Sequence, residues 1–576
     1  MTTSSLTTSG RRVLLALATA GLAAPALAQT TPASPRYDWQ WATQLGPRQT
    51  PGLGAGETTL GGLAADATGR VVVGGSYQPA LSFANSPTVL RTSFPITSTA
   101  TSGYVVQYAP TGTLAWTVDL AGGLDAKVAD VATDAAGNTY AVGFYVQRVA
   151  FNGLLPLQGG TSFLVKISPA GVPLWAVNVM NSPILAANGG WQLATDLAGN
   201  CVVRGGFVGS VTLGTRTYTG PGALAHPFVA RYSAAGALLS SWAGVQTGTP
   251  TYGPSTFHGL VLGPAGEVYM SGIAAPGITL QFGNLPPVVG TGNSDTGFLL
   301  RITPAGTADW AFNSPGVALA DLVISRTSGY LYLEGGTLSG FTLGGLTYPY
   351  PTGSGLGLFI AQVRPNGTVR KFLGGGRDRG GNLAIGPRDE LSLGFLLNGR
   401  WDNAQIDPPA TPNDQNIGVI QIDSAGHSLR SWQASGPSVV RAVKIAVDGT
   451  GQATFAAWAL GAPVSFAFGS SAVGVPTAFS VLVGRTSLRP LAARAAQEIV
   501  GFDVFPNPTQ GEVHVAAQGV APIALEVRDA LGRTVGKTTL ANGARTFALP
   551  GLAAGIYLVR AQQGAAVSYR RLSIAP

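Results

Sequence analysis

The chain has 576 residues, of which only 10% are charged and 45% are apolar, so its composition excludes an intrinsically disordered protein. Its formal net charge of +8 is small for this length and is not concentrated in a block of Lys or Arg, which excludes the electrostatic footprint of nucleic-acid binding. The 81 Gly and 39 Pro residues instead indicate many short strands joined by tight turns.

The N-terminus carries the pattern of a secretory signal peptide. Arg11 and Arg12 precede an apolar run over residues 13–24, and Ala26-Leu27-Ala28 places small residues where a signal peptidase cuts. We predict a signal peptide over residues 1–28, cleaved between Ala28 and Gln29. The apolar run is shorter than a membrane-spanning helix, and no later run is longer, so we expect no transmembrane segment in the mature chain.

A short turn between two strand-like runs recurs along the chain. In its clearest form, Asp134-Ala135-Ala136-Gly137-Asn138, the Asp side chain can accept hydrogen bonds from backbone amides and the Gly permits a left-handed residue. Equivalent positions at 69, 137, 199, 266, 329, 389 and 451 lie 60 to 68 residues apart, which indicates seven copies of one unit. Each turn offers a single carboxylate, whereas a calcium loop needs several oxygen ligands, so we interpret the turns as hairpins.

Six of the copies contain a second hairpin that leads into an aromatic strand, as Ser168-Pro169-Ala170-Gly171 leads to Trp175. Four strands per copy is the content of one β-propeller blade. The recurring tryptophans could form an aromatic surface for sugars, but their single structural position beside an apolar neighbour favours packing between repeats. They are Trp41, Trp116, Trp175, Trp242, Trp310 and Trp432.

The seventh copy lacks its fourth strand, and a matching strand stands alone at the mature N-terminus. We predict that Tyr37–Gln44 forms the outermost strand of the sheet that contains residues 441–485. This pairing closes a seven-bladed propeller over residues 37–485 and removes two exposed sheet edges. An open solenoid would need polar capping repeats, and none is visible.

The repeats are similar to the bacterial SBBP-type β-propeller repeats. The similarity rests on residues 134–144 (DAAGNTYAVGF), on residues 163–171 (FLVKISPAG) and on Trp175, and it weakens in the last three copies. It implies a fold that occurs in many secreted proteins, without a fixed activity.

Beyond a predicted linker at residues 486–501, residues 502–576 contain short strand-like runs separated by Gly, Pro and Asn, which indicates a small β-sandwich. Three motifs here resemble the type A sorting domain of the type IX secretion system of Bacteroidetes. They are Phe505-Pro506-Asn507-Pro508, the stretch with Leu531 and Gly532, and Gly555-Ile556-Tyr557, while Arg571 stands where the family more often has Lys.

This resemblance implies recognition by an outer-membrane translocon and processing by its sortase-like protease. It also implies an extracellular location, either in the medium or attached to the cell surface. The alternative is a plain accessory sandwich domain.

The residue types that carry catalysis form no recognisable constellation. Cys201 is the single cysteine and lies in a strand-like run, which favours a buried structural thiol. The histidines lack metal-ligand spacing and are interpreted as surface or hairpin residues: His226, His258, His427 and His514. Four acidic residues cluster around a junction between repeats, where we expect them to be solvated: Asp119, Asp125, Asp130 and Asp134. We therefore predict no catalytic, cofactor-binding or metal-binding residue, and no cofactor.

The sequence favours a non-catalytic secreted or cell-surface protein that binds polysaccharide or an envelope or other protein partner. The alternative is a secreted propeller enzyme acting on polysaccharide, either a glycosidase or a lyase. A glycosidase needs two placed carboxylates, and the low acid content disfavours it. Loops of different repeats can still assemble a site that sequence spacing does not reveal.

Overall fold

The computed structural model describes residues 37–575 except 49–55, 93–99, 122, 181–190, 252, 293, 349–356, 378–381, 397–399, 403, 408–414, 437–439, 461–463, 470, 476–478, 491–498, 500–501, 511, 518–521, 530–532, 542–545, 549–550 and 564–565. Ala28 and Gln29, the predicted signal cleavage site, lie outside these residues. Every regular element in the described part is a β-strand, so the chain is all-β, as its composition predicts. No helix of the described part is long and apolar enough to cross a membrane.

The repeats form seven antiparallel sheets, each built on four strands, and a hairpin extends three of them to six strands. Sheet 1 contains β2 (Glu57–Ala65), β3 (Val71–Gln78), β6 (Ser102–Tyr108) and β7 (Leu114–Leu120); sheet 2 contains β8 (Asp125–Thr133), β9 (Thr139–Val146), β12 (Ser162–Ile167) and β13 (Pro173–Met180); sheet 3 contains β14 (Gln192–Thr195), β15 (Cys201–Phe207), β18 (His226–Tyr232) and β19 (Leu238–Ala243); sheet 4 contains β21 (Thr256–Leu262), β22 (Val268–Ala274), β25 (Thr296–Ile302) and β26 (Ala308–Pro315). Sheet 5 contains β27 (Val317–Ile324), β28 (Leu331–Thr337), β31 (Gly357–Val363) and β32 (Val369–Arg377); sheet 6 contains β33 (Leu383–Ile385), β34 (Leu391–Leu396), β37 (Gln415–Ile422) and β38 (Ser428–Gly436); sheet 7 contains β39 (Val440–Val447), β40 (Ala453–Ala459), β43 (Ser480–Pro490) and β1 (Tyr37–Pro47).

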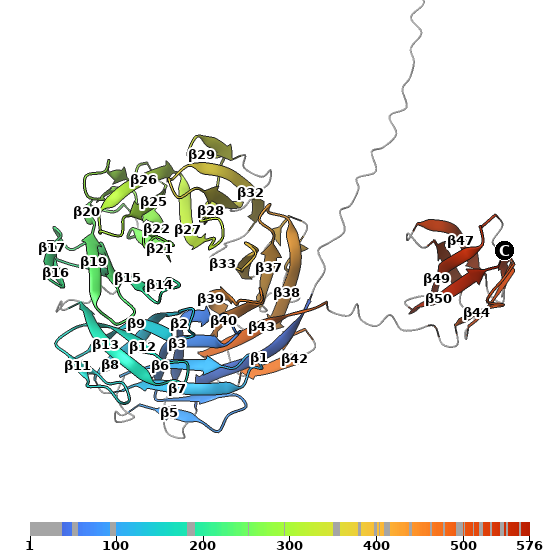
Figure 1. The fold of residues 1–576 in the computed structure, drawn as a ribbon, viewed down its shortest axis with the longest axis horizontal. Helices are drawn as coiled ribbons and strands as arrows, with labels where there is room; N and C mark the ends of the chain where they lie inside the picture. The colour runs from blue at the N-terminus through green and yellow to red at the C-terminus, as the bar shows by residue number, and fades with distance from the viewer. Residues whose placement is uncertain are drawn as a thin grey trace, which may run out of the picture. The chain divides into compact units, whose positions relative to one another are not determined.

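The first strands of successive sheets lie side by side. β2 contacts β8, β8 contacts β14, and the series continues through β21, β27, β33 and β39, which in turn contacts β2 (Figure 1). Second and third strands such as β3 and β6 are buried along almost their whole length, because the apolar faces of neighbouring sheets cover them on both sides. The core is therefore a series of apolar clusters that lie between consecutive sheets.

An additional hairpin joins the second and third strands of each repeat, and the sequence analysis did not predict it. Each hairpin contacts the end of the preceding sheet: β4 (Ala80–Phe83) pairs with β1, β35 (Arg400–Trp401) with β32, and β41 (Val464–Phe468) with β38. The partner strands of these three are β5 (Val89–Arg91), β36 (Ala404–Gln405) and β42 (Ser471–Val475). The others are β10 (Arg148–Val149) with β11 (Leu157–Gln158), β16 (Ser210–Leu213) with β17 (Arg216–Thr219), β23 (Ile278–Gln281) with β20 (Val245–Gly248) and β24 (Val288–Val289), and β29 (Phe341–Leu343) with β30 (Leu346–Tyr348). These hairpins cover strand edges that would otherwise be free to pair with another chain.

The predicted pairing of the N-terminal strand is confirmed. β1 lies beside β43 in the order β39-β40-β43-β1, with Thr43 opposite Val483 and Leu45 opposite Val481. Strand β43 continues to Pro490, so residues 486–490 of the predicted linker belong to a strand. Ser487 is buried there, and its carbonyl accepts a hydrogen bond of 3.0 Å from Trp432 Nε1.

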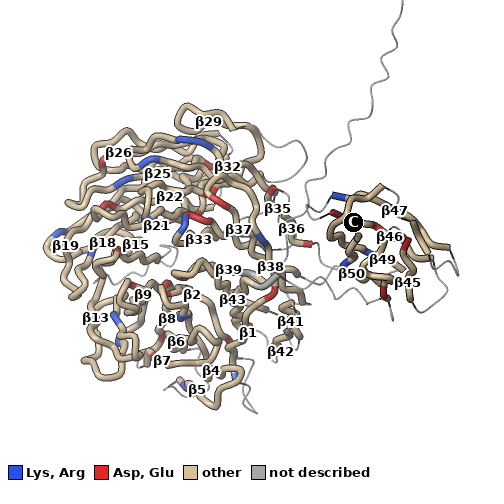
Figure 2. The backbone as a smooth tube through the Cα atoms, turned by 45° about the vertical axis from the view of Figure 1, so that its right-hand side comes forward, with Lys and Arg blue, Asp and Glu red and all other residues tan. Residues whose placement is uncertain are grey.

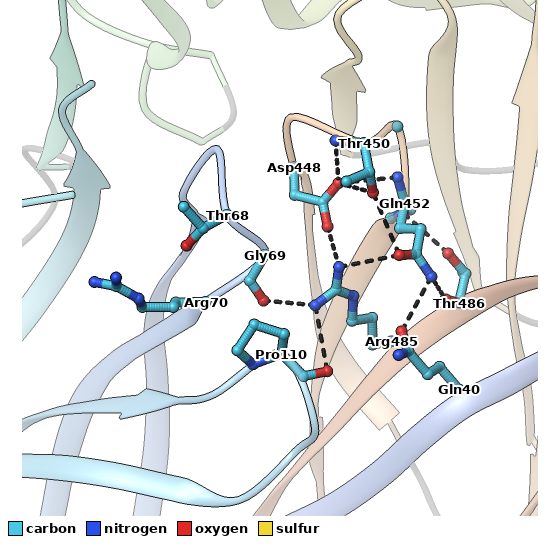
Figure 3. Close-up of polar contacts among 12 residues, drawn as sticks. Gln40, Thr68, Gly69, Arg70, Pro110, Asp448, Thr450, Gln452, Arg485 and Thr486 are labelled. Carbon is cyan, nitrogen blue, oxygen red and sulfur yellow. Dashed lines mark hydrogen bonds and ion pairs between the residues drawn. The ribbon is translucent and has the colours of Figure 1, made fainter. Parts of the chain in front are cut away.

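A buried arginine connects sheet 7 to sheet 1 (Figure 3). Arg485 Nη1 donates to the carbonyl oxygens of Gly69 at 2.6 Å and Pro110 at 3.4 Å, and Nη2 donates to Asp448 Oδ2. Gln452 accepts a further bond from Nη2 at 3.1 Å and donates to Gln40 Oε1 at 3.0 Å. The two terminal nitrogens of the guanidinium are therefore paired and hydrogen-bonded to both sheets, which compensates part of the loss of its hydration.

The recurring tryptophans pack between consecutive sheets, as predicted. Their indole Nε1 atoms donate to a carbonyl in the second hairpin turn of the next repeat: Trp41 to Pro110, Trp116 to Pro169, Trp175 to Ala234 and Trp310 to Pro365, at 2.9 to 3.3 Å. Trp432 is fully buried, and Trp242 packs against Phe282 with 5.9 Å between ring centroids. Gly171 lies in the turn that contacts Trp116. Its φ is +81°, and a Cβ on it would lie 2.6 Å from the Trp116 ring, so both the turn conformation and the contact favour glycine.

The C-terminal domain consists of two antiparallel sheets around one core. One contains β44 (Asp503–Phe505), β45 (Glu512–Ala516) and β48 (Thr546–Ala548); the other contains β47 (Thr534–Leu540), β46 (Ile523–Arg528), β49 (Gly555–Gln563) and β50 (Ala566–Ile574). Ile499 already packs into this core, and its amide donates to Ser568 Oγ at 2.9 Å, so the domain begins before the predicted residue 502.

Over all the described strands of the chain, charged residues are sparse, and Lys and Arg are interspersed with Asp and Glu (Figure 2).

Candidate functional site

A cavity of about 570 Å³ is lined by the ends of the first strands and by the turns that follow them, with residues from all seven repeats. We call this cavity the mouth. It is the place where the recurring turns, which are far apart in the sequence, come together. The turns were predicted from the sequence, but the cavity that they share was not.

The carboxylates of these turns serve the turns themselves. Asp134 Oδ1 accepts hydrogen bonds from the amides of Ala136 at 3.0 Å and Asn138 at 2.9 Å, and Gly137 has a φ of +77°. Asp66 and Asp448 accept the same pair of amide bonds in their own turns. The prediction of hairpin turns is therefore confirmed in these repeats, and each of these carboxylates accepts bonds from its own turn.

Two turns begin with Gly in place of Asp, and there a glutamate from the end of the turn supplies the carboxylate. Ala265 N donates to Glu267 Oε2 at 3.0 Å, and Arg388 N donates to Glu390 Oε2 at 2.8 Å. A Cβ on Gly263 would lie 2.5 Å from the Glu267 carboxyl carbon, so only Gly leaves room for the glutamate. The sequence signal was available in the shared Gly-Pro-x-x-Glu spacing at 263–267 and 386–390.

The wall of the mouth is mainly apolar. Leu262, Ile324, Ile385 and Val447 line it just before their turns. Thr133 and Thr195 also line it, but their hydroxyls donate to the carbonyls of Ala65 at 3.0 Å and of Thr133 at 2.8 Å, so these hydroxyl donors are used between strands. Among the described residues, no aromatic side chain lines the cavity, and the rim includes Leu197, which is 64% exposed.

Charged residues occupy the bulges of the first strands, four residues before the turns. Asp130 Oδ2 accepts from Leu193 N at 2.9 Å, and Asp321 Oδ2 accepts from Leu383 N at 2.9 Å, so each carboxylate joins its strand to the next repeat. Burial raises the pKa of Asp130 to about 6, although Lys444 opposes the shift. These carboxylates therefore connect strands and do not form a free acid–base pair.

Two further charged groups lie on the second strands. Burial lowers the pKa of Arg204 to about 9, and this guanidinium donates from Nη2 to Gln192 Oε1 and Phe257 O, both at 2.9 Å. Glu334 is 1% exposed, and burial together with the charge of Asp321 raises its pKa to about 8.

The expectation that the acidic cluster is solvated is wrong. Asp119 accepts a 2.8 Å bond from the Tyr77 hydroxyl, and its burial raises its pKa to about 6. Asp125 accepts a bond from the Thr101 hydroxyl. Asp130 and Asp134 accept the backbone bonds described above, and Asp134 is buried. The four residues have different structural partners and do not converge on one site.

The isolated cysteine and histidines have local roles. Cys201 is buried, as predicted, and burial raises the pKa of its thiol. His226 was expected near the surface, but it is fully buried, its Nδ1 accepts from Gln246 N at 2.9 Å, and burial lowers its pKa. His258 lies 2.7 Å from Thr256 Oγ1, His427 is exposed beside Asp423, and His514 stacks on Phe505. Within the described residues, no group of three or more His, Cys, Asp or Glu could hold a metal ion.

In the C-terminal domain, the first predicted motif is joined to the last strand. Asn507 Nδ2 donates to Arg571 O at 2.6 Å, Ser573 N donates to Asn507 Oδ1 at 2.8 Å, and Thr509 N donates to Ser573 O at 2.9 Å. Phe505 precedes this junction, with Pro506 and Pro508 both following cis peptide bonds. Gly555, Ile556 and Tyr557 begin β49, whereas Leu531 and Gly532 lie outside the described residues.

The family model described as a secretion system C-terminal sorting domain matches residues 503–575. This match agrees with the motifs and their place in the fold, and it supports export by the type IX route. The protein is therefore a secreted, extracellular protein with a sorting domain that provides for cell-surface attachment.

No curated protein matches the chain. Among solved structures, the extracellular domain assigned to a one-component system of B. thetaiotaomicron is 10% identical, with 90% of this chain and 80% of that chain covered and a TM-score of 0.19. The extracellular region of plexin A4 is 7% identical, with 77% and 66% covered and a TM-score of 0.27. A glycoside hydrolase of family 32 from Bifidobacterium adolescentis is 12% identical, with 94% and 95% covered and a TM-score of 0.19. Likeness at these TM-scores carries no argument about this chain.

Proposed function

We propose that residues 37–490 form a closed seven-bladed β-propeller of the SBBP type, in a Bacteroidetes protein whose signal peptide is removed after Ala28. The contacts of the first strands support this, because the series begins and ends at β2. The pairing of β1 with β43 supports it as well, because a strand from the other end of the repeat region completes sheet 7.

We propose further that this propeller is a non-catalytic binding module whose ligand enters the mouth. The observation that carries the proposal is a cavity lined by the same turn of every repeat, with an apolar wall and with turn carboxylates already bonded to backbone amides. Such a wall stabilises a ligand by removing apolar surface from water. A glycosidase needs two carboxylates placed for the substrate. The carboxylates of Asp66, Asp134 and Asp448 accept bonds within their own turns, and that of Asp389 accepts from the Ser325 hydroxyl, which disfavours the enzyme alternative.

A protein partner fits the mouth better than a polysaccharide. Sugar rings commonly pack on aromatic side chains, and the cavity lining contains none. A segment that inserts Leu, Ile or Val side chains would match the wall formed by Leu262, Ile324, Ile385 and Val447.

Site-specific photo-crosslinking on living cells tests this binding role. A crosslinking residue at Leu197, on the rim of the mouth, should give a discrete covalent complex with one envelope protein. Leu239 is the matched control, because it is 50% exposed but lies on the fourth strand of sheet 3, away from the cavity lining. Equal crosslinking from both positions would contradict a binding site at the mouth.

A panel of soluble polysaccharides tests the enzyme alternative and the carbohydrate ligand together. The purified protein should release no reducing or unsaturated products, and it should bind glycans on an array no better than a Leu197→Asp variant. Product formation would replace the binding module by the enzyme alternative.

For export, we propose that the translocon of the type IX system and its sortase-like protease are the partners of the C-terminal domain. Processing is expected between residues 490 and 499, because β43 ends at Pro490 and Ile499 already belongs to the domain core. Deletion of residues 499–576 should trap the protein in the periplasm, as measured by immunoblots of cell fractions. Normal appearance of the truncated chain outside the cell would contradict the route.

A further inference from the structure

We infer that the outer face of the β46-β49-β50 sheet is the surface that docks onto the export machinery, and that its partner is an acidic protein surface with an apolar centre. The inference rests on the proposed export route and adds the contact face and the chemistry of the partner. We call this surface the β49 face. It comprises Ile556, Leu558, Tyr569, Arg528, Arg560 and Arg571.

Strand alternation places large apolar side chains on this face. In β49 and β50, Val559, Ala561 and Leu572 are fully buried and point into the domain core. Their neighbours along the strands therefore point the opposite way. Ile556 is 56% exposed, Leu558 41% and Tyr569 51%. Three exposed side chains of this kind on one small sheet do not stabilise the folded domain, so their clustering indicates an interaction surface.

The register of the sheet surrounds these apolar residues with arginines. Leu558 lies between Arg528 of β46 and Arg571 of β50, each directly opposite it in the register. In the next row, Arg560 lies between Glu526 and Tyr569. Cross-strand neighbours of this kind are close enough to form one surface.

The charge of the face selects an acidic partner. Glu526, the carboxylate beside these residues in the described part of β46, already forms ion pairs with Arg528 at 3.1 Å and Lys537 at 3.5 Å. The guanidinium groups of Arg560 and Arg571 therefore leave the face with a positive charge. Guanidinium groups around an apolar centre favour carboxylates on the opposing surface, which would select the partner and its orientation.

The opposite sheet has a different character. Its exposed positions in β45 and β48 are Glu512, His514, Thr546 and Ala548, and its one large exposed apolar residue, Phe505, stacks on His514. Among the described residues of these strands there is neither a comparable apolar cluster nor an arginine. The contrast between the two faces of one domain is what assigns docking to the β49 face.

Two substitutions on the face test the inference in the full-length protein, expressed in cells with a type IX system. Leu558→Glu places a carboxylate between Arg528 and Arg571, where it forms favourable pairs inside the domain while repelling an acidic partner. Arg571→Glu reverses the charge of the rim, and Arg571→Lys preserves it. We expect the two Glu variants to reduce the extracellular protein about tenfold, as for loss of one interface hot spot, and to accumulate it in the periplasm. Arg571→Lys should export normally.

Thr546→Glu is the matched control, because it adds the same charge at an exposed strand position of the opposite sheet. Thermal unfolding of each purified variant checks that the domain still folds. If Leu558→Glu and Arg571→Glu fold and export like wild type while deletion of residues 499–576 traps the chain, docking at this face is wrong and the route stands. If the deletion also exports normally, the proposed route itself fails.

Discussion

At the scale of single residues, substitution of Arg485 gives the largest expected change in the free energy of unfolding. Its guanidinium is 3% exposed and paired with Asp448, which is equally buried. Removing one member of a buried pair leaves the other charge without compensation, so Arg485→Met should lower the free energy of unfolding by about 3–5 kcal/mol. Urea denaturation measures this.

The double variant Arg485→Met, Asp448→Asn provides the control. Because no uncompensated carboxylate remains, it should recover part of the lost stability. A single variant as stable as wild type would show that the pair does not hold sheets 1 and 7 together. The contacts of Arg485 could not be predicted from the sequence, because its partners Gly69 and Pro110 are about four hundred positions away along the chain.

Glu334 makes the stability depend on pH. Burial raises its pKa from 4.5 to about 8, so between these values the native state holds a proton that the unfolded chain has released. Unfolding then releases that proton, and the stability falls as the pH rises, by up to about 1.4 kcal/mol per pH unit. Asp119 and Asp130 contribute in the same direction only up to about pH 6. Asp321, which is also buried with a raised pKa, acts in the same direction, whereas the lowered pKa values of His226 and His258 oppose it near pH 6.5. The contribution of Glu334 is therefore the difference in slope between wild type and a variant at this position.

Replacing Glu334 by Gln should flatten this slope and raise the unfolding midpoint at pH 8. Urea or thermal unfolding at pH 6.5, 7.25 and 8 measures the effect, and Glu512→Gln, at an exposed strand position, should leave the slope unchanged. An unchanged slope in Glu334→Gln would mean that this carboxyl is ionised in the folded protein.

At the scale of elements, two glycine substitutions can measure how much the contact between a tryptophan and the hairpin turn of the next repeat contributes to stability. Gly171 and Gly153 both have a positive φ, at +81° and +85°, but a Cβ on Gly171 would lie 2.6 Å from the Trp116 ring, whereas nothing lies within 4 Å at Gly153. Gly153→Ala should cost about 1 kcal/mol for the backbone conformation. Gly171→Ala should cost about 1–3 kcal/mol more because it overpacks the junction, and the difference in urea unfolding isolates the contact. Equal costs would show that Trp116 moves aside freely.

Some of these elements could be predicted from the sequence, and others could not. The turns and the Trp positions were predictable because local chemistry and a fixed interval repeat together, as at Asp134 and Trp175. The hairpins that join second and third strands were not, because strands of two to five residues such as β10 and β41 vary in sequence. Their links to the preceding repeat, such as the pairing of β41 with β38 and the bridge between Ala150 and Ala121, form only in the folded chain. The mouth was hidden for the same reason: its lining is assembled only when residues such as Leu262 and Val447 meet in space.

At the scale of the whole molecule, closure depends on one strand. β1 contributes Leu45, which is fully buried, and Trp39, whose Nε1 donates to Gln433 O of sheet 6 at 2.9 Å. A chain that lacks residues 37–47 would expose the edge of β43 and open an apolar cluster to water. We expect this truncated protein to self-associate in size-exclusion chromatography and to unfold at a lower temperature than wild type.

A peptide of residues 37–47 added to the truncated protein should reverse both effects, because strand addition restores the backbone hydrogen bonds with β43 and fills the pocket for Trp39. The same peptide with Trp39→Asp keeps the backbone pairing but places a carboxylate in the apolar cluster, so it should bind far more weakly. Isothermal titration calorimetry compares the two peptides directly. Equal binding would mean that the strand is held by backbone pairing alone, and a monomeric truncated protein with wild-type stability would show that β1 is dispensable for closure. The circular arrangement would then be held by the other connections between sheets 7 and 1, which include Arg485, the contacts of β39, β40 and β43 with β2, and the apolar cluster that the two sheets share.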